Sequence, residues 1–299
     1  MGNLRRCHVN AEKAYPLELK DVPYTAPSDD EVTIRNHAVG LNPVDWARQI
    51  MAAALFSSTT YPDILGADVV GKVVEVGLAA ASRFKPGDHV LASLTASIPA
   101  SLPFEQVAAI PLAISPAACG LFQEDHLALK LPTEHPAPPT GQTDLIWSGS
   151  SSVGSNAIQL AVAAGYESLG PSQTFNNHSP TISAGALMIG MTAAAPCAAI
   201  VDRVEGKKFV SVSNHFSGSL PKEVQPKFIL CGNNDVCHAI FKEYLPRALE
   251  NSIFKSASRA EVVVHSLRSV QKGLDNLKQN EGSFIPYKEY SAYLLNDYF

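Results

Sequence analysis

Apolar and polar residues alternate in short runs along the first third of the chain, which is the pattern of half-buried β-strands. Residues 31–38 (EVTIRNHA) alternate in this way, and residues 68–76 (DVVGKVVEV) form a run of β-branched side chains. Within residues 84–92 (FKPGDHVLA), a Pro-Gly-Asp sequence predicts a tight turn before a further strand. Gly71 and Gly77 lie inside and beside the valine-rich run, where they predict a bulge or a bend at the corner of a barrel. This third of the chain therefore predicts a small β-barrel.

The pattern then changes. Residues 103–122 are apolar and interrupted by prolines, which predicts one or two short helices, and the proline-rich residues 131–143 predict an exposed connector. From Asp144 onward, strand and helix patterns alternate, which is typical of a parallel sheet with helices on both faces. These elements are expected at residues 145–147, 155–164, 186–189, 193–201, 208–212, 227–230 and 235–251. One more strand and an amphipathic helix are expected within residues 260–280, whereas the aromatic tail after Glu281 shows no clear strand.

Composition and charge narrow the class of protein. The chain has 299 residues, of which 46% are hydrophobic and 17% charged, so it is long enough for two globular domains. The formal net charge is −5 and no basic block is present, which argues against binding to nucleic acid. Five cysteines at irregular spacing, after a polar start without a signal-peptide pattern, argue against a secreted protein with structural disulfides. We therefore expect a reduced, cytoplasmic protein.

The segment closest to a membrane span is residues 184–201 (AGALMIGMTAAAPCAAIV), which is long enough to cross a bilayer. It is rich in alanine and is interrupted by Pro196. A buried strand followed by a helix of small residues explains this segment better than a membrane span does. We therefore expect the protein to have no membrane partner.

The most informative short sequence is residues 149–154 (GSSSVG), which follows a predicted strand and precedes a predicted helix. The first N–H groups of a helix lack acceptors within it and carry partial positive charge, so phosphate groups bind there when the turn consists of small residues. Compared with the dinucleotide pattern G-x-G-x-x-G, Ser151 replaces the middle glycine, and its hydroxyl can donate to a phosphate oxygen. The context favours a nucleotide site, and a serine-rich helix start without a ligand is the alternative. A hydrolase is disfavoured because the cluster lacks the second glycine of a nucleophile elbow.

Four motifs, in the same order along the chain, resemble the medium-chain dehydrogenase/reductase superfamily. They are LNPVDW at 41–46, LGADVVG at 65–71, FKPGDHV at 84–90, and the turn and helix at 148–160. The nearest branch is that of the fungal trans-acting enoyl reductases, which serve polyketide synthases in secondary metabolism. The resemblance implies an α/β fold, with a GroES-like β-barrel domain, a shortened Rossmann-type doubly wound parallel sheet, and an active site in the cleft between them. It places the barrel domain at residues 1–115, the Rossmann domain at 116–258 and the return to the barrel domain at 259–299.

The resemblance also implies an activity, in which NADPH reduces the double bond of an α,β-unsaturated thioester carried by the synthase. Hydride reaches the β-carbon, and the enolate formed needs polar stabilisation before the α-carbon is protonated. The implied cofactor-binding residues are Val44, Asp45, Trp46, Ala47, Ser151, Ser152, Val153 and Gly154. The implied substrate cleft is lined by Ser115, Pro116, Ala117, Ala118, Cys119, Gly120, Leu121 and Phe122. Because this branch is often monomeric, we expect a monomer whose partner is the polyketide synthase.

The resemblance implies no zinc. Zinc-dependent relatives have a cysteine early in the barrel and a histidine beside the glycine-rich strand, whereas this sequence has residues 43–45 (PVD) and Ala67 at these points. Cys231 and the pair Cys237-His238 have side chains of metal-ligand type but no second pair, and we interpret these cysteines as buried thiols.

Several departures from the family pattern bear on activity. Ala47 lies where relatives usually have a lysine, and Pro116, which cannot donate a hydrogen bond, lies where a threonine is common. After Glu167, the second Rossmann strand and its helix are expected to be absent, together with the group that binds the 2′-phosphate of NADPH. Asn177 replaces a tyrosine that packs near the adenine ribose, and the aromatic tail replaces the last strand of the barrel.

These departures leave several hypotheses open. The preferred one is an enoyl reductase, of low activity or with segments altered by mis-spliced introns. The second is a non-redox scaffold or cyclase, or an inactive remnant, on the same fold. The third is a quinone or short-enal reductase, because the same pair of domains supports both reactions.

Overall fold

The structure is a computed structural model of the chain. It describes residues 4–55, 59–92, 94–133, 135, 137–170, 182–189, 194–213, 219–256, 261–264, 266–282 and 293–295. The chain forms two compact units. Unit 1 consists of Met1–Leu112 with Arg259–Phe299, and unit 2 consists of Ala113–Ser258. Each unit has its own sheet structure and its own hydrophobic core.

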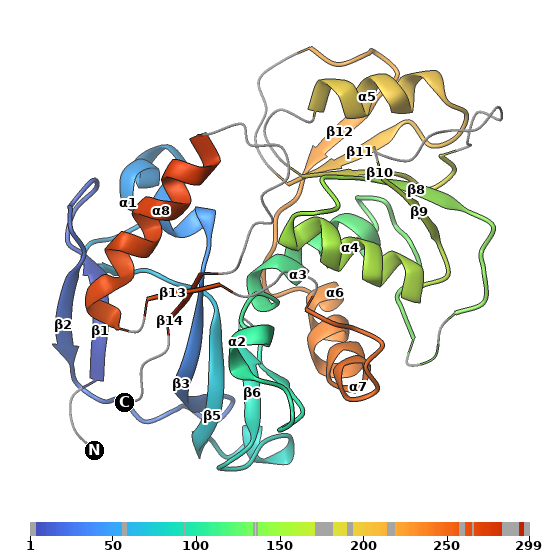
Figure 1. The fold of residues 1–299 in the computed structure, drawn as a ribbon. Helices are drawn as coiled ribbons and strands as arrows, with labels where there is room; N and C mark the ends of the chain where they lie inside the picture. The colour runs from blue at the N-terminus through green and yellow to red at the C-terminus, as the bar shows by residue number, and fades with distance from the viewer. Residues whose placement is uncertain are drawn as a thin grey trace. The chain divides into compact units, whose positions relative to one another are not determined.

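Unit 1 is the strand-rich part of the chain (Figure 1). Its elements are β1 (Leu4–Val9), β2 (Glu18–Val22), β3 (Val32–Leu41), α1 (Pro43–Leu55), β4 (Asp63–Ile64), β5 (Val69–Val76), η1 (Ala80–Ser82), β6 (His89–Ala92), β7 (Ala96–Ser97), α2 (Phe104–Val107), β13 (Glu261–Val264), η3 (Leu267–Ser269), α8 (Val270–Gly282) and β14 (Tyr293–Leu295). One sheet has the strand order β2-β1-β4, and the other has the order β13-β14-β3-β5-β6-β7. The predicted barrel-like domain of short strands is therefore present.

The long strands β3 and β5 confirm the strands predicted at residues 31–38 and 68–76. Their antiparallel pairing is interrupted next to Asn36, which lies opposite Gly71. A Cβ atom at Gly71 would lie 2.0 Å from the carbonyl oxygen of Arg35, so only glycine fits at this approach of the two backbones. The bulge predicted at Gly71 is therefore confirmed.

Helix α8 lies beside α1 and covers part of the strands of unit 1 (Figure 1). Its residues Val270, Leu274 and Leu277 are buried in one core cluster with Cys7 of β1. Their spacing of four and three residues places them on one face of the helix. The amphipathic helix predicted within residues 260–280 is therefore confirmed.

The tail of the chain contributes a strand to unit 1, which the sequence did not predict. Strand β14 lies between β13, which it pairs in parallel, and β3, which it pairs antiparallel with Tyr293 opposite Leu41. The prediction that the tail has no strand is therefore wrong at residues 293–295. Three residues are too few to show the alternation on which a strand prediction depends, and the unpaired backbone groups of a neighbouring strand edge decide the pairing instead.

Unit 2 contains a single five-stranded sheet among its described residues, with the order β12-β11-β10-β8-β9 and parallel pairing throughout (Figure 1). Helix α3 (Pro111–Phe122) leads into it. The elements that follow are β8 (Thr143–Trp147), α4 (Ser152–Ala163), β9 (Glu167–Leu169), β10 (Gly185–Met188), α5 (Ala194–Arg203), β11 (Phe209–Val212), β12 (Gln225–Phe228), α6 (Asp235–His238), the π-helical η2 (Ala239–Tyr244) and α7 (Leu245–Glu250). The alternation predicted from Asp144 onward is confirmed.

The central strands of unit 2 are buried on both faces. In β10, Ala186 and Met188 pack in a core cluster with Cys197 of α5, whereas Leu187 points to the other face and approaches Gly120 of α3. Successive side chains of a strand point to opposite faces, so a strand covered on both sides is apolar throughout. The prediction of helices on both faces of a parallel sheet is therefore confirmed (Figure 1).

The second strand of the Rossmann pattern is present, contrary to the prediction that it is absent after Glu167. Strand β9 pairs in parallel with β8, and the Ser168 hydroxyl donates a hydrogen bond of 2.7 Å to the Asp144 carboxylate. The strand was missed because it has only three residues. The predicted absence of the helix after this strand falls on residues 171–181, which lie outside the described residues. Asn177, expected in place of a tyrosine, lies outside the described residues.

Among the described residues, one helical stretch is long and apolar enough to cross a membrane by length and composition, namely Phe104–Phe122. In the fold, 67% of its apolar window is buried. The core helix of a soluble protein passes the same test, so this stretch is weak support for a membrane span. The segment at 184–201, which the sequence singled out, contains β10 and most of α5.

Candidate functional site

The Gly-Ser turn joins the end of β8 to the start of α4 in unit 2. Ser148 follows the strand with a positive φ of 63° and donates its hydroxyl to the Ile189 carbonyl oxygen at 2.7 Å, which links the ends of β8 and β10. Ser151 is the N-cap of α4: its Oγ accepts a hydrogen bond from the Gly154 N–H at 3.1 Å and donates to the Ser148 carbonyl oxygen at 2.8 Å. The turn is therefore held by its own hydroxyl groups.

The two glycines of the turn are required by close packing. A Cβ atom at Gly154 would lie 2.2 Å from the Ser148 carbonyl oxygen, and one at Gly149 would lie 2.8 Å from the Ile158 methyl group. The first turn of α4 can therefore lie directly against the end of β8. Because Ser151 satisfies the N–H of Gly154, the N–H groups of Ser152 and Val153 are the ones that lack an acceptor within the helix. Small residues and free N–H groups at the carboxyl end of a central parallel strand fit a diphosphate.

The neighbouring strand β9 ends without an acidic side chain. Its last residues and the next one are Ser168, Leu169 and Gly170, and Glu167 lies at the opposite end of the strand. In Rossmann domains, an acidic residue at the carboxyl end of this strand binds the ribose hydroxyls of NAD and would repel the 2′-phosphate of NADP. Among the described residues, none at the carboxyl end of β9 carries a negative charge that would repel a phosphate.

The Asp-Trp motif lies at the start of α1 in unit 1, and its aspartate stabilises the helix start. Asp45 accepts a hydrogen bond from the Asn42 N–H at 2.8 Å, and its own N–H donates to the Asn42 carbonyl oxygen at 2.9 Å. The bond from the Asn42 N–H to the Asp45 carboxylate is one half of a capping box, and the other half is absent because the Asn42 side chain donates to Asp68 instead. The Asp45 side chain is buried, which raises its pKa to about 6. Trp46 packs against the core cluster around Cys7, and the preceding Val44 is half-buried.

Position 47 carries no polar side chain, and the adjacent arginine does not replace one. Ala47 is half-buried on α1. Arg48 forms an ion pair with Asp63, with its Nε 3.0 Å from the carboxylate. The Arg48 guanidinium is therefore held by a residue of β4 within unit 1.

The structure adds Asp68, which sequence reasoning left out of the site although it lies in the quoted motif LGADVVG. Its carboxylate is buried, accepts a hydrogen bond from Asn42 Nδ2 at 2.8 Å, and has one oxygen without a hydrogen-bond partner. Burial raises the pKa of Asp68 to about 8. The sequence signal that could have identified Asp68 is a single acidic residue next to an apolar strand. A carboxyl group buried there must be either protonated or paired with a donor or a positive charge.

The predicted substrate-lining residues lie on α3, and most of them are packed inside the protein. Seven of the eight residues from Ser115 to Phe122 are buried, and Pro116 is the one that is not. At Gly120, a Cβ atom would lie 2.6 Å from a methyl group of Leu187 and 2.8 Å from one of Ile229, so the helix rests directly on the sheet. The structure therefore gives these residues a packing role in unit 2, and their contact with a substrate stays a prediction.

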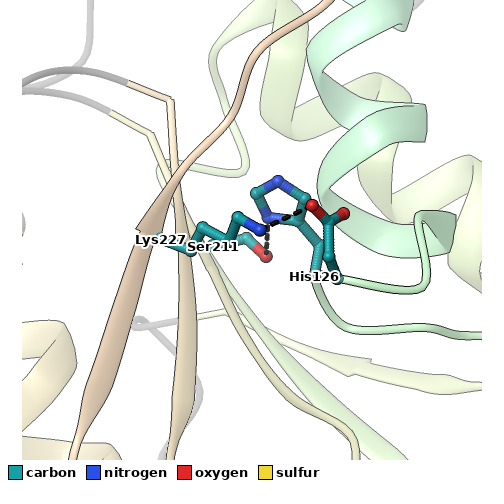
Figure 2. A network of polar contacts seen from close by, with 4 residues as sticks. His126, Ser211 and Lys227 are labelled. Carbon is teal, nitrogen blue, oxygen red and sulfur yellow. Dashed lines mark hydrogen bonds and ion pairs between the residues drawn. The ribbon is translucent and has the colours of Figure 1, made fainter. Parts of the chain in front are cut away.

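Figure 2 shows a polar network in unit 2, in which His126 Nδ1 lies 3.2 Å from Ser211 Oγ. Ser211 donates its hydroxyl to the Gly120 carbonyl oxygen at 3.0 Å, so it accepts the hydrogen bond from the histidine. Beside them, Lys227 forms an ion pair with Asp125. Ser211 is fully buried and its proton is already donated, so the pair links α3 to the sheet and cannot act as nucleophile and base.

The prediction that Cys231 and Cys237 are both buried is wrong for Cys231, which is exposed. Cys231 lies in the connection between β12 and α6, and such connections run over the surface. Cys237 is buried, and its sulfur is 3.5 Å from that of Cys119. In the part of the chain that the structure describes, no group of three or more His, Cys, Asp and Glu residues is arranged to hold a metal ion.

The cofactor residues implied by the sequence thus fall into two groups. Ser151, Ser152, Val153 and Gly154 lie together on one turn of unit 2, and the residues from Val44 to Ala47 lie together on the first turns of α1 in unit 1.

Comparison with known proteins agrees with this architecture. Residues 28–127 match the family model described as "Alcohol dehydrogenase GroES-like domain". One similar solved structure is an alcohol dehydrogenase superfamily protein from Novosphingobium aromaticivorans, with a TM-score of 0.72 and 19% identity, covering 98% of this chain and 99% of that one. A second is the CurK enoyl reductase, with a TM-score of 0.68 and 16% identity, covering 98% of both chains. A third is a mycobacterial protein complexed with NADPH, with a TM-score of 0.64 and 14% identity, covering 98% of this chain and 99% of that one. At these identities, the structures show the shared fold.

Two curated relatives are closer in sequence. The dehydrogenase pigH of Monascus ruber is 36% identical, over 90% of this chain and 94% of the relative. The trans-enoyl reductase himH of Aspergillus japonicus is 31% identical, over 83% of this chain and 86% of the relative. The alignment with pigH spans 350 positions, more than the 299 residues of this chain, so the relative has segments that this chain lacks. The chain belongs to the medium-chain dehydrogenase/reductase superfamily, together with these fungal dehydrogenase and trans-enoyl reductase relatives, and is an oxidoreductase.

Proposed function

We propose that the protein is a trans-acting enoyl reductase, which uses NADPH to reduce an α,β-unsaturated thioester carried by a fungal polyketide synthase. The observation that carries the proposal is the turn between β8 and α4, where Gly154 allows the helix start to lie against the strand end. The trans-enoyl reductase himH, 31% identical to the chain, supports the choice of reaction within the superfamily. We also propose that the protein is cytoplasmic and acts as a monomer that meets its substrate on the synthase.

The residues of the turn have defined tasks in this proposal. The N–H groups of Ser152 and Val153 bind the diphosphate, and the hydroxyl of Ser151 keeps the helix start in place through Gly154. Bound NADPH supplies the hydride for the β-carbon of the substrate. Because β9 ends in Ser168, Leu169 and Gly170, no acidic group at that strand end would repel the 2′-phosphate, which supports NADPH over NADH.

The charge that develops on the thioester oxygen needs a hydrogen-bond donor. The two positions where relatives usually have a lysine and a threonine offer none here, because they are Ala47 and Pro116. Arg48 is held by Asp63 and does not take over this role. The proposed reaction therefore depends on backbone N–H groups or water for this stabilisation, and we expect slower turnover than in relatives with the lysine.

These same two residues favour a second candidate, a non-redox scaffold or cyclase on the same fold. It differs from the first in what happens to NADPH and substrate. A reductase binds NADPH and consumes it with a crotonyl thioester, whereas a non-redox protein leaves the absorbance of NADPH unchanged. Consumption with a quinone but not with the thioester would instead identify a quinone reductase.

The binding site itself is tested by Ser152→Asp. A carboxylate at the start of α4 stabilises the helix through its dipole, but it repels a diphosphate bound there by about 1–4 kcal/mol. We expect NADPH, followed by nicotinamide fluorescence, to saturate the unaltered protein in the micromolar range and to bind the variant about tenfold or more weakly.

The matched control is Ser269→Asp, the same substitution directly before α8 in unit 1. It should leave NADPH binding unchanged, while both variants melt at or above the temperature of the unaltered protein. Equal binding by the Ser152→Asp variant and the unaltered protein would overturn the diphosphate site. The absence of any NADPH binding to the unaltered protein would overturn the reductase.

A further inference from the structure

Three cysteines of unit 2 meet at one place, and no part of the proposed reaction uses them. Cys119 lies on α3, Cys231 in the connection after β12, and Cys237 on α6. The sulfur atoms of Cys119 and Cys237 are 3.5 Å apart, and the thiol of Cys231 is also hydrogen-bonded to the Cys119 sulfur. We call these residues the thiol cluster. It is free of disulfides.

Cys119 is the acceptor of the thiol cluster. Its sulfur lies 3.4 Å from Asn234 Nδ2, which donates to it, in addition to its hydrogen bonds with Cys231 and Cys237. Donors aimed at one sulfur favour its thiolate form, and the thiols of Cys231 and Cys237, followed by the amide of Asn234, lower the pKa of Cys119. The same hydrogen bonds raise the pKa of Cys231 and of Cys237, so Cys119 is the thiol of the cluster whose ionisation they favour.

Access to solvent differs within the thiol cluster. Cys119 and Cys237 are fully buried, whereas Cys231 is exposed and follows Leu230, whose exposed fraction is 73%. A small oxidant in solution therefore meets Cys231 first. When the Cys231 thiol loses its proton, its exposed sulfur becomes a nucleophile. The connection that carries Cys231 lacks regular structure at residues 229–234, so it can shift to bring the two sulfurs into bonding distance.

We propose that the thiol cluster is a redox modification site, at which hydrogen peroxide converts Cys119 and Cys231 into a disulfide. In the first step, the sulfur of Cys231 attacks one oxygen of the peroxide, the O–O bond breaks, and hydroxide leaves and is protonated to water. This leaves Cys231 as a sulfenic acid. In the second step, Cys119 gives up its thiol proton and attacks that sulfur as the thiolate, the S–O bond breaks, and the leaving hydroxide takes up a proton to form a second water molecule. The two thiols lose two electrons and two protons, and the peroxide gains them.

The remaining cysteines support the choice of pair and serve as internal controls. Cys197 lies in the core cluster under α5, where burial raises the pKa of its thiol to about 12. Cys7 is buried in unit 1, where burial raises its pKa to about 11, and its thiol donates to the Leu267 carbonyl oxygen. Neither is hydrogen-bonded to a second thiol among the described residues. Both should remain reduced under conditions that oxidise the thiol cluster.

The test is peptide mapping by mass spectrometry, without reduction, of the purified full chain after exposure to dilute hydrogen peroxide. We expect a peptide pair joined through Cys119 and Cys231, formed about tenfold or more faster than any oxidation of Cys197 or Cys7. In the Cys231→Ser variant, Cys119 should stay reduced over the same time. The Cys197→Ala variant, which removes a cysteine outside the thiol cluster, should form the linked pair at the rate of the unaltered protein.

Three outcomes would overturn the proposal. They are Cys231 ending as sulfinic acid with Cys119 still reduced, a linked pair that joins Cys119 to Cys237 in place of Cys231, and oxidation of Cys197 at the same rate as the thiol cluster. The linked pair is detected without NADPH or substrate. Its absence is therefore independent of the outcome of the NADPH titration, and the two proposals can fail separately.

Discussion

At the scale of single residues, buried carboxyl groups are the most unusual feature of unit 1. Asp68 and Asp45 lie close together and share Asn42 as a hydrogen-bond donor, one through its side chain and the other through its backbone N–H. Burial is the largest cause of the raised pKa of Asp68, and the negative charge of Asp45 adds to it. Asn42 supplies too few donors for the oxygens of both carboxylates. Keeping Asp68 protonated therefore costs less free energy than burying a second negative charge beside Asp45.

The raised pKa of Asp68 makes the stability of the fold depend on pH. Between its ordinary value of 3.8 and about 8, the folded chain retains a proton that the unfolded chain releases. The free energy of unfolding therefore falls as pH rises through this window. Replacing Asp68 with asparagine removes the charge and keeps an oxygen for Asn42. We expect Asp68→Asn to be nearly neutral at about pH 3 and to raise the free energy of unfolding by about 1–3 kcal/mol at about pH 9.

Urea unfolding at a series of pH values checks this expectation. The control is Asp30→Asn, because Asp30 is exposed in unit 1. Its pH profile should follow that of the unaltered protein. If the Asp68→Asn variant also followed that profile, burial of the charged form could not be the cause of the pH dependence.

At the scale of elements, the start of α4 combines a structural and a binding role. Ser151 caps the helix through its Oγ, and its removal leaves the Gly154 N–H without this acceptor. We expect Ser151→Ala to lower the free energy of unfolding by about 1 kcal/mol. Ser150→Ala, one residue earlier at an exposed position, should leave it unchanged. Chemical denaturation of both variants measures the difference, and equal stability of the two would contradict the cap.

The elements also show which predictions a sequence supports. Helix α8 and strand β3 were predicted because their apolar residues repeat with a clear period, and strands β5 and β10 because each is a run of β-branched or apolar residues. Strands β9 and β14 were missed because three residues do not establish a period. For both strands, the deciding contribution comes from a neighbouring strand that is distant in sequence: β8 for β9 and β3 for β14.

At the scale of the whole molecule, the chain returns to unit 1 after completing unit 2. Strand β14 lies between β13 and β3, so the end of the chain joins two strands that are far apart in sequence. We expect a chain ended after residue 292 to show about tenfold faster hydrogen exchange in β3, because this strand loses a hydrogen-bonded neighbour. Exchange in β8 of unit 2 should not change, because the missing strand pairs only within unit 1.

The matched control for this truncation is a chain ended after residue 295, which retains β14. Hydrogen-exchange mass spectrometry of the two truncated proteins compares them peptide by peptide. Equal exchange in β3 would show that β14 does not stabilise the sheet, and faster exchange in β8 of the shorter chain would show that the two units unfold together.

The sequence by itself determined the two-part α/β architecture, the periodic elements and the turn at residues 149–154, because these depend on local spacing of apolar, glycine and serine residues. It also identified the superfamily through four short motifs. Only the tertiary structure decided that β9 and β14 form strands, that Asp68 is a buried acid beside Asn42, and that Cys119 meets Cys231 and Cys237. Each of these depends on groups that are distant along the chain, and burial and hydrogen bonding between such groups exist only once the chain has folded.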